Sequence, residues 1–128
     1  MIITSEDFPK ELTGISQTGS ALQSIQKQYN PALVCMTRGS KGSLALIENQ
    51  EIVTPGFQVQ VIDSTGAGDV FRGGFISAWL RAGNSTSVED ILRYANATAA
   101  MKCQALGART GIPTRDELEQ FLHLDQDE

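Results

Sequence analysis

Short apolar runs recur along the chain, and their patterns are typical of β-strands. Residues 32–36 are apolar without interruption, as expected of a strand that is buried on both faces of a sheet. Residues 57–61 instead alternate apolar and polar side chains, which is typical of a half-buried strand. Two further runs separated by residues 48–50 indicate a hairpin. The predicted strands are 2–4, 32–36, 43–47, 51–54 and 57–61.

Apolar residues at helical spacing predict helices between and after these strands. In residues 69–82, five apolar side chains share one face of the predicted helix, namely those of Phe71, Phe75, Ala78, Trp79 and Ala82. The Ala-rich residues 88–105 suit close packing against a neighbouring helix. The predicted helices are a short one that ends at Gly14 and longer ones at 18–29, 69–82, 88–105 and 115–122.

Strands that alternate with helices favour a layered α/β fold with a mostly parallel sheet. The 128 residues are enough for one domain with a hydrophobic core. Because the first residues already have the pattern of a strand, we expect further structure upstream of residue 1. In such folds ligands bind at the carboxyl ends of strands, so the loops that lead into helices are the first candidates for chemistry.

Composition limits the classes of binding partner and the cellular location that we expect for the protein. The formal net charge of −5 argues against nucleic acid as a main partner, because phosphate backbones bind Lys- and Arg-rich surfaces. It leaves room for ATP, which needs only local donors at a loop or helix end. No signal peptide opens the chain, and no apolar run approaches the ~20 residues that span a bilayer. Cys35 and Cys103 are predicted to be reduced thiols, so we expect a cytoplasmic protein with no membrane partner. His123 is predicted to be a surface residue.

A glycine-rich turn between a predicted strand and a predicted helix carries the strongest chemical signal. In Gly66-Ala67-Gly68 a ligand can approach the backbone closely, and the helix that follows presents unpaired N–H groups and the positive end of its dipole. This combination suits an anion such as a phosphoryl group in transfer. Asp69 adds a negative charge there, which fits a general base that takes a proton from an attacking hydroxyl. The four residues alone equally allow a tight turn in which Asp69 only caps the helix.

Two other glycine motifs do not fit this turn. A dinucleotide-binding fingerprint would need Gly or Ala where the chain has Phe71. A Walker A loop would need Gly-Lys-Ser/Thr after four spacer residues, and the chain has no such string.

A second loop at a strand end, from Thr37 through Gly39 to Gly42, offers a hydroxyl and glycine amides to nucleotide phosphates. Strand-to-hairpin turns often have similar sequences, so an ordinary turn remains the alternative. Arg38 and Lys41 are either phosphate contacts or solvated loop charges. No spacing of residues in the chain predicts a metal-ligand cluster.

Together these segments resemble the ribokinase-like (PfkB) carbohydrate kinase family. Residues 63–75, Asp-Ser-Thr-Gly-Ala-Gly-Asp-Val-Phe-Arg-Gly-Gly-Phe, are similar to the C-terminal signature of the family. The spacing from the Thr37 loop through Pro55-Gly56-Phe57 is also similar, as is the segment 94–100 followed by Gly107. The resemblance covers nearly the whole chain, but only the C-terminal part of a longer family fold.

The resemblance implies a three-layer ribokinase-like (Rossmann-like) α/β fold. Residues 1–128 would be a single domain, the C-terminal nucleotide-binding and catalytic part, with a mostly parallel sheet plus a small hairpin. The implied activity is ATP-dependent phosphotransfer to an alcohol, most similar to sugar kinases such as ribokinase and fructokinase. The substrate-binding and lid parts of the family lie upstream, so residues 1–128 alone are expected to be inactive, and a homodimer of the full-length protein is left open.

The resemblance also assigns roles to individual residues. Asp69 matches the catalytic base, and Gly66, Ala67 and Gly68 match the anion hole. The implied cofactors are ATP and Mg²⁺, and some members of the family also bind a monovalent cation, K⁺, through backbone carbonyls. The matching ATP-binding positions are Thr37, Gly39, Gly42, Gly68 and Asn96. The matching cation-binding positions are Asp63, Thr65, Lys102, Ala105, Gly107 and Gly111.

One position departs from the family pattern. Family members usually carry Asn-x-x-Glu before Leu-Thr-Gly, a motif linked to magnesium and phosphate handling. Here Phe8 stands at the Glu position counted back from Leu12, and Glu6 takes its place only with a shift in the alignment. Magnesium is still expected, because phosphoryl transfer needs the charge of ATP neutralised.

Two alternatives to a sugar kinase remain open from the sequence. One is a nucleotide-binding fragment without catalysis, and the other is a nucleoside or vitamin kinase of the same fold. The match around Pro55-Gly56-Phe57 favours a sugar as the substrate, by resemblance only.

Overall fold

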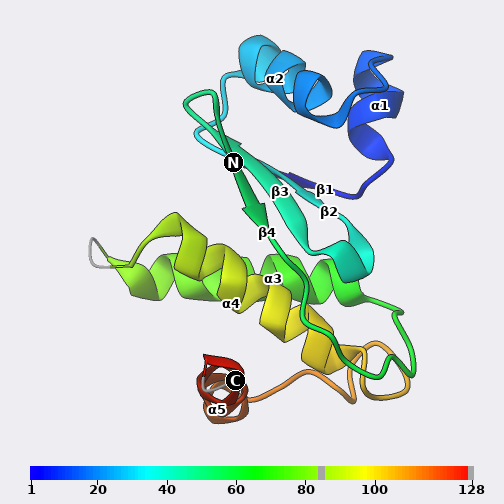
Figure 1. The fold of residues 1–128 in the computed structure, drawn as a ribbon, viewed down its shortest axis with the longest axis vertical. Coiled ribbons are helices and arrows are strands. Elements are labelled where there is room, and N and C mark those ends of the chain that lie inside the picture. Colours follow the sequence, from blue (N-terminus) through cyan, green and yellow to red (C-terminus); the bar gives the residue numbers. More distant parts are fainter. Residues whose placement is uncertain (84–85, 127–128) are drawn as a thin grey trace. The chain divides into compact units, whose positions relative to one another are not determined.

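The computed structural model describes residues 1–83 and 86–126. The chain divides into two compact units, Met1–Pro55 and Gly56–Glu128, and Figure 1 traces both along the sequence. The first unit contains the sheet, and the second contains three long helices and the glycine-rich turn.

The first unit is a four-stranded sheet with two helices (Figure 1). Helices α1 (Phe8–Thr13) and α2 (Thr18–Tyr29) follow the first strand, and a short 3₁₀ turn, η1 (Gly39–Lys41), joins the second strand to the third. The strands, in their order across the sheet, are β1 (Ile2–Thr4), β2 (Val34–Thr37), β3 (Ser43–Ile47) and β4 (Gln50–Thr54).

The pairing of these strands corrects one prediction. β1 and β2 are parallel, whereas β2–β3 and β3–β4 are antiparallel, so the prediction of a mostly parallel sheet is wrong for the described strands. The connections explain the difference, because short turns can only join antiparallel neighbours. Glu48 and Asn49 both have positive φ angles, 49° and 66°, as a tight hairpin turn requires.

Apolar side chains of α2 and the sheet form the core of the first unit. This cluster consists of Leu22, Ile25, Val34, Met36, Leu44 and Leu46. Cys35 is buried and unpaired, and burial raises the pKa of its thiol to about 12 although Ser43 hydrogen-bonds to it. A thiol with this pKa stays protonated at neutral pH, and the reduced state of Cys35 stays a prediction.

The second unit is built on three helices, α3 (Ala67–Ala82), α4 (Val88–Lys102) and α5 (Arg115–Gln126). α3 begins two residues before the predicted start, α4 ends three residues before the predicted end, and α5 extends beyond residue 122. At the start of α5, Thr114 and Glu117 form a reciprocal capping box, in which each backbone N–H donates to the other side chain at 3.2 Å.

Close approach of α3 and α4 depends on a missing side chain. A Cβ atom added to Gly74 of α3 would lie 2.7 Å from the Thr98 hydroxyl oxygen and 3.0 Å from the Thr98 Cβ of α4. The Thr98 hydroxyl also donates to the Tyr94 carbonyl at 2.8 Å, which fixes its rotamer. The expected close packing of the Ala-rich helix is therefore confirmed.

The strand predicted for residues 57–61 is absent from the structure, which has irregular backbone there. Phe57 is held by side-chain packing instead. Its ring lies 5.2 Å from the ring of Phe121, and the guanidinium of Arg93 lies 5.2 Å from its centre. Alternation of apolar residues was the basis of the prediction, but alternation alone supplies no partner strand.

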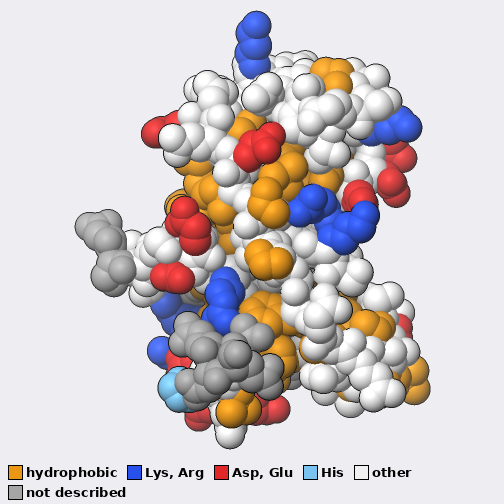
Figure 2. All heavy atoms as spheres, in the orientation of Figure 1, with side chains coloured by type: hydrophobic (Ala, Val, Ile, Leu, Met, Phe, Trp, Pro, Cys, Tyr) orange, Lys and Arg blue, Asp and Glu red, His pale blue; other side chains and the backbone are white. Residues whose placement is uncertain are grey.

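The distribution of charge on the surface and the apolar character of the helices bear on two kinds of partner, nucleic acid and a membrane. Figure 2 shows acidic and basic side chains interspersed over the displayed face rather than gathered by sign. Among the described residues, none of the helices combines the length and the apolar character that crossing a bilayer requires.

Candidate functional site

The glycine-rich turn opens α3 with an unusual backbone conformation. Gly66 is the N-cap residue, with φ 77° and ψ 4°, a left-handed conformation that side-chain-bearing residues rarely adopt. The Ala67 N–H donates to the Ser64 carbonyl at 3.1 Å, and the Val70 N–H donates to the Gly66 carbonyl at 2.9 Å. The turn therefore folds back on itself before the helix continues.

Two backbone donors remain at this helix end. Within the described residues, the N–H groups of Gly68 and Asp69 have no hydrogen-bond partner, and α3 has no side-chain cap. Both residues are exposed. The helix dipole adds partial positive charge at this end, so the backbone here offers hydrogen-bond donors to an anion. Of the three residues predicted for the anion hole, Gly68 offers a free donor, while the Ala67 N–H is already used by Ser64.

Asp69 lies in the first turn of α3 and does not cap it. Its side chain is 84% exposed, and one carboxylate oxygen accepts a hydrogen bond from Arg72 at 2.8 Å. The alternative in which Asp69 serves as an N-cap is therefore wrong, because Gly66 occupies that position. Sequence analysis missed Arg72 as a partner, although the i, i+3 spacing on a helix indicates the pair.

A second set of contacts fixes the segment that precedes the turn. The N–H groups of Ile62 and Asp63 both donate to the Cys103 carbonyl, at 2.7 and 3.1 Å. The Asp63 carboxylate accepts from the Thr65 N–H at 2.9 Å and from the Gly107 N–H at 2.8 Å. The loop before α3 is thus bound to the loop that follows α4.

All six positions that match cation ligands come together in this region. Besides the bonds of Asp63 to Thr65 and Gly107, the Ala105 N–H donates to the Lys102 carbonyl at 3.2 Å. Gly111 lies against the same carbonyl, because a Cβ on Gly111 would come within 2.4 Å of it. The ammonium of Lys102 donates to the Asp63 carbonyl at 2.7 Å. One of the expected ligand oxygens therefore already binds a positive charge of the protein.

These contacts lower the pKa of the Asp63 carboxyl from 3.8 to about 2. Hydrogen bonds from the Thr65 hydroxyl and N–H contribute most, followed by the Gly107 N–H, and the positive charge of Lys102 adds to them. The ionised form is the one that the surrounding donors stabilise.

Asp63→Asn is expected to lower the melting temperature at neutral pH and to have less effect in acid. Because the folded pKa of about 2 lies below the ordinary 3.8, the carboxylate contributes stability above about pH 4 and loses it as the pH falls toward 2. Melting curves of both proteins between about pH 7 and pH 3 measure this. Asp7→Asn is the control, since Asp7 is exposed and does not cap α1 through its side chain. A difference between wild type and Asp63→Asn that stays constant with pH would contradict the expectation.

The second predicted loop leaves β2 in the first unit. The Thr37 hydroxyl donates to the Thr4 carbonyl at 3.4 Å, and Gly39 and Gly42 have positive φ angles of 57° and 94°. The loop is closed by the Arg38 N–H, which donates to the Gly42 carbonyl at 2.8 Å. The Arg38 Nε is buried and has no hydrogen-bond partner within the described residues. A buried N–H without a partner is costly, so this loop fits an acceptor such as a phosphate oxygen.

Asn96 lies in α4, where the residue is 7% exposed and its side-chain amide nitrogen donates to the Leu92 carbonyl at 2.8 Å. The side chain is therefore anchored to its own helix. Its predicted contact with a nucleotide stays a prediction.

The structure also shows where the residues lie that depart from the Asn-x-x-Glu pattern of the family. α1 begins at Phe8, and Glu6 lies exposed in the turn before it. Among residues 1–83 and 86–126, no group of three or more His, Cys, Asp or Glu side chains is arranged to hold a metal ion.

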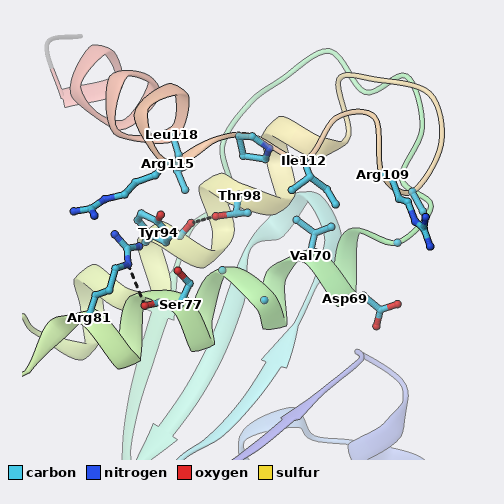
Figure 3. Close-up of a pocket in the computed structure, with 15 residues that line it drawn as sticks. Asp69, Val70, Ser77, Arg81, Tyr94, Thr98, Arg109, Ile112, Arg115 and Leu118 are labelled. Atoms are coloured by element: carbon cyan, nitrogen blue, oxygen red, sulfur yellow. Dashed lines mark hydrogen bonds between the residues drawn. The ribbon is translucent and has the colours of Figure 1, made fainter.

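A cavity of about 630 Å³ lies between α3, α4, α5 and the loop before α5 (Figure 3). Val70 and Ser77 of α3, Tyr94 and Thr98 of α4 and Leu118 of α5 line it. Figure 3 shows the Asp69 carboxylate directed away from the side of α3 that carries Val70 and Ser77. Asp69 is nevertheless among the residues that line the cavity, together with Gly66 of the same turn.

The sequence matches one family description, pfkB family carbohydrate kinase, over residues 3–115. It is 35% identical to a ribokinase of Haemophilus influenzae in an alignment that covers 94% of this chain and 40% of the relative. A fructokinase of Vibrio alginolyticus is also 35% identical, over 88% of this chain and 38% of its own length. The chain therefore spans about 40% of the length of the curated relatives it matches.

Similar solved structures are also ribokinases and fructokinases. A fructokinase double mutant of Vibrio cholerae O395, in a form with fructose, ADP and potassium ion bound, has a TM-score of 0.86 at 33% identity. It matches 94% of this chain and 39% of its own. A ribokinase of Thermotoga maritima has a TM-score of 0.83 at 31% identity, over 94% of this chain and 41% of its own. These likenesses confirm the expected ribokinase-like α/β fold.

Proposed function

This chain belongs to the pfkB family of carbohydrate kinases, and we propose that it carries the catalytic base and the ATP-phosphate contacts of an ATP-dependent sugar kinase. In this proposal residues 1–128 are the C-terminal nucleotide-binding and catalytic part of the enzyme. The curated relatives include ribokinases, fructokinases, deoxyribokinases and an ATP-dependent ribose-1-phosphate kinase, and their names favour a hydroxyl of a sugar or sugar phosphate as the acceptor.

The observation that carries the proposal is the N-terminus of α3. There the free N–H groups of Gly68 and Asp69 lie beside an exposed carboxylate on the same turn. An anion site that only bound phosphate would gain nothing from a neighbouring negative charge. A carboxylate at this place is explained if it accepts a proton from a hydroxyl that attacks the phosphorus.

The proposed step is a single displacement at the γ-phosphorus of ATP. The acceptor hydroxyl oxygen forms the new P–O bond while its proton passes to the Asp69 carboxylate, and the bond from phosphorus to the β,γ-bridging oxygen breaks to release ADP. The N–H groups at the start of α3 would stabilise the charge on the transferred phosphoryl oxygens. Magnesium would arrive with ATP and neutralise the charge on its phosphates.

The Thr37–Gly42 loop is the proposed contact for the ATP phosphates. Its support is the Arg38 Nε, a buried donor without a partner among the described residues, in a loop shaped by the positive φ angles of Gly39 and Gly42. Phosphate oxygens would satisfy that donor. Asn96 remains a proposed nucleotide contact, by resemblance.

The proposal is tested by ADP release from Mg·ATP in the intact protein, measured against a panel of ribose, fructose, deoxyribose and nucleosides. We expect ADP release that depends on a sugar. Release only with nucleosides would favour a nucleoside kinase of this fold, and ATP binding without release from any acceptor would favour a nucleotide-binding protein without catalysis. Residues 1–128 alone are expected to show no sugar phosphorylation.

A further inference from the structure

A fully buried lysine closes the C-terminal end of α4. Lys102 is the last residue of the helix, and its side chain is 0% exposed. Lysine is rarely buried to this extent without a partner. Here the partner is the Asp63 carbonyl, which accepts from the ammonium at 2.7 Å.

The Lys102 ammonium lies at one of the expected ligands of the monovalent cation. Asp63 is one of the six positions that match cation ligands, and its carbonyl oxygen is among the oxygens that would face such an ion. A second expected ligand, the Lys102 carbonyl, accepts the Ala105 N–H at 3.2 Å. The Asp63 carboxylate is likewise occupied, by the N–H groups of Thr65 and Gly107.

These residues do not fit a free potassium ion beside Lys102. A potassium ion needs oxygen ligands in place of its hydration shell, and here at least two of the expected oxygens already accept hydrogen bonds. An ion bound to the Asp63 carbonyl would also lie next to a buried ammonium, and like charges at that separation repel strongly away from water.

We propose that the ammonium group of Lys102 takes the place of the monovalent cation, so that this protein folds and works without potassium. This inference rests on the proposed function, because the cation positions belong to the same family site. The ammonium carries the same single positive charge as the ion and, like it, is bound by a carbonyl oxygen. It joins the segment before α3 to the end of α4 from within the chain, at a point where a cation would otherwise join them.

The electrostatics of the neighbouring carboxyl support this role. The Asp63 carboxylate accepts the N–H groups of Thr65 and Gly107, and it belongs to the residue whose carbonyl binds the Lys102 ammonium. A cation at this position therefore stabilises the ionised carboxylate whose hydrogen bonds hold the loops. In this protein the lysine supplies that cation permanently.

The test compares the intact wild-type protein with Lys102→Met in KCl, NaCl and choline chloride at equal ionic strength. The methionine side chain keeps an unbranched apolar stem and removes the charge. Thermal melting and sugar-dependent ADP release are both recorded. Lys27→Met is the matched control, because Lys27 is an exposed lysine near the end of α2.

The expected result has two parts. Wild type and Lys27→Met show the same melting temperature and turnover in all three salts. Lys102→Met melts below wild type in choline chloride, and KCl raises its melting temperature by about 4 °C or more, because an ion that binds only the folded state stabilises it.

Potassium-specific stabilisation or activation of the wild type would overturn the inference, and this comparison needs no variant. A folded Lys102→Met protein that gains no response to KCl would overturn it as well. If the methionine variant does not fold, Lys102→Gln replaces it. Should the intact protein release no ADP with any acceptor, the proposed function fails, while the melting temperatures in the three salts still decide the role of Lys102.

Discussion

Asp69→Asn is expected to lower the turnover of the intact enzyme by a factor of about 10²–10⁴ and to leave its affinity for ATP nearly unchanged. Asparagine has the same shape and keeps the backbone N–H groups at the start of α3, but it cannot take up the proton of the acceptor hydroxyl. The side chain is 84% exposed, and among the residues that the structure describes it pairs with Arg72 alone, so the substitution disturbs little of the fold. Steady-state ADP release gives the turnover, and calorimetry with ATP gives the affinity.

Asp90→Asn is a closely matched control. Asp90 occupies in α4 the helix position that Asp69 occupies in α3, the third residue after the N-cap, and it is also exposed. The control therefore removes the same charge from the same place relative to a helix dipole. If Asp69→Asn turned over sugar at nearly the wild-type rate, the assignment of Asp69 as the base would be lost.

Gly66→Val is expected to lower the free energy of unfolding by about 2 kcal/mol or more and to abolish measurable phosphoryl transfer. Two effects combine at this position. A β-branched residue is strained at φ 77°, and the new Cβ would lie 3.0 Å from the Cβ of Ala108. Relief of either strain moves the N–H groups that follow. Urea denaturation of the intact protein measures the change in stability.

Gly68→Ala is the control for Gly66→Val, because it adds a side chain to the same turn without the backbone strain and without the close contact. Gly68 is already helical, and a Cβ there meets no atom within 4 Å. The stability of this variant should be close to that of wild type. Equal denaturation midpoints for Gly66→Val and Gly68→Ala would contradict the argument.

The sequence predicted the elements around the candidate site well, since local patterns determine them. On the predicted apolar face of α3, Phe71 and Phe75 are buried, whereas Trp79 is 44% exposed. The glycine-rich turn opens the helix. Residues 57–61 show where local pattern fails. Their alternation predicted a strand, but strand formation depends on a partner that no local pattern supplies, and Phe57 packs on Phe121 instead.

The sequence also identified residues of the candidate site, but it did not predict all of the contacts between them. Lys102 was singled out for its carbonyl, and nothing in a one-dimensional pattern indicates that its ammonium is buried against Asp63, 39 residues earlier. The pairing of Asp69 with Arg72 could have been predicted from the sequence, because side chains at i and i+3 on a helix are neighbours. The difference between the two cases is sequence separation.

The contact between residues 62–65 and residues 103–111 has a consequence for building hybrid enzymes from this chain and its relatives. The Asp63 carboxylate bridges Thr65 and Gly107, the Cys103 carbonyl accepts two N–H groups from Ile62 and Asp63, and both contacts cross between segments about forty residues apart. A graft that carried the catalytic turn alone would separate it from the donors and acceptors that set its position. The two segments are thus a single transplantable module, and a recombination boundary drawn between them would cut through the scaffold of the turn.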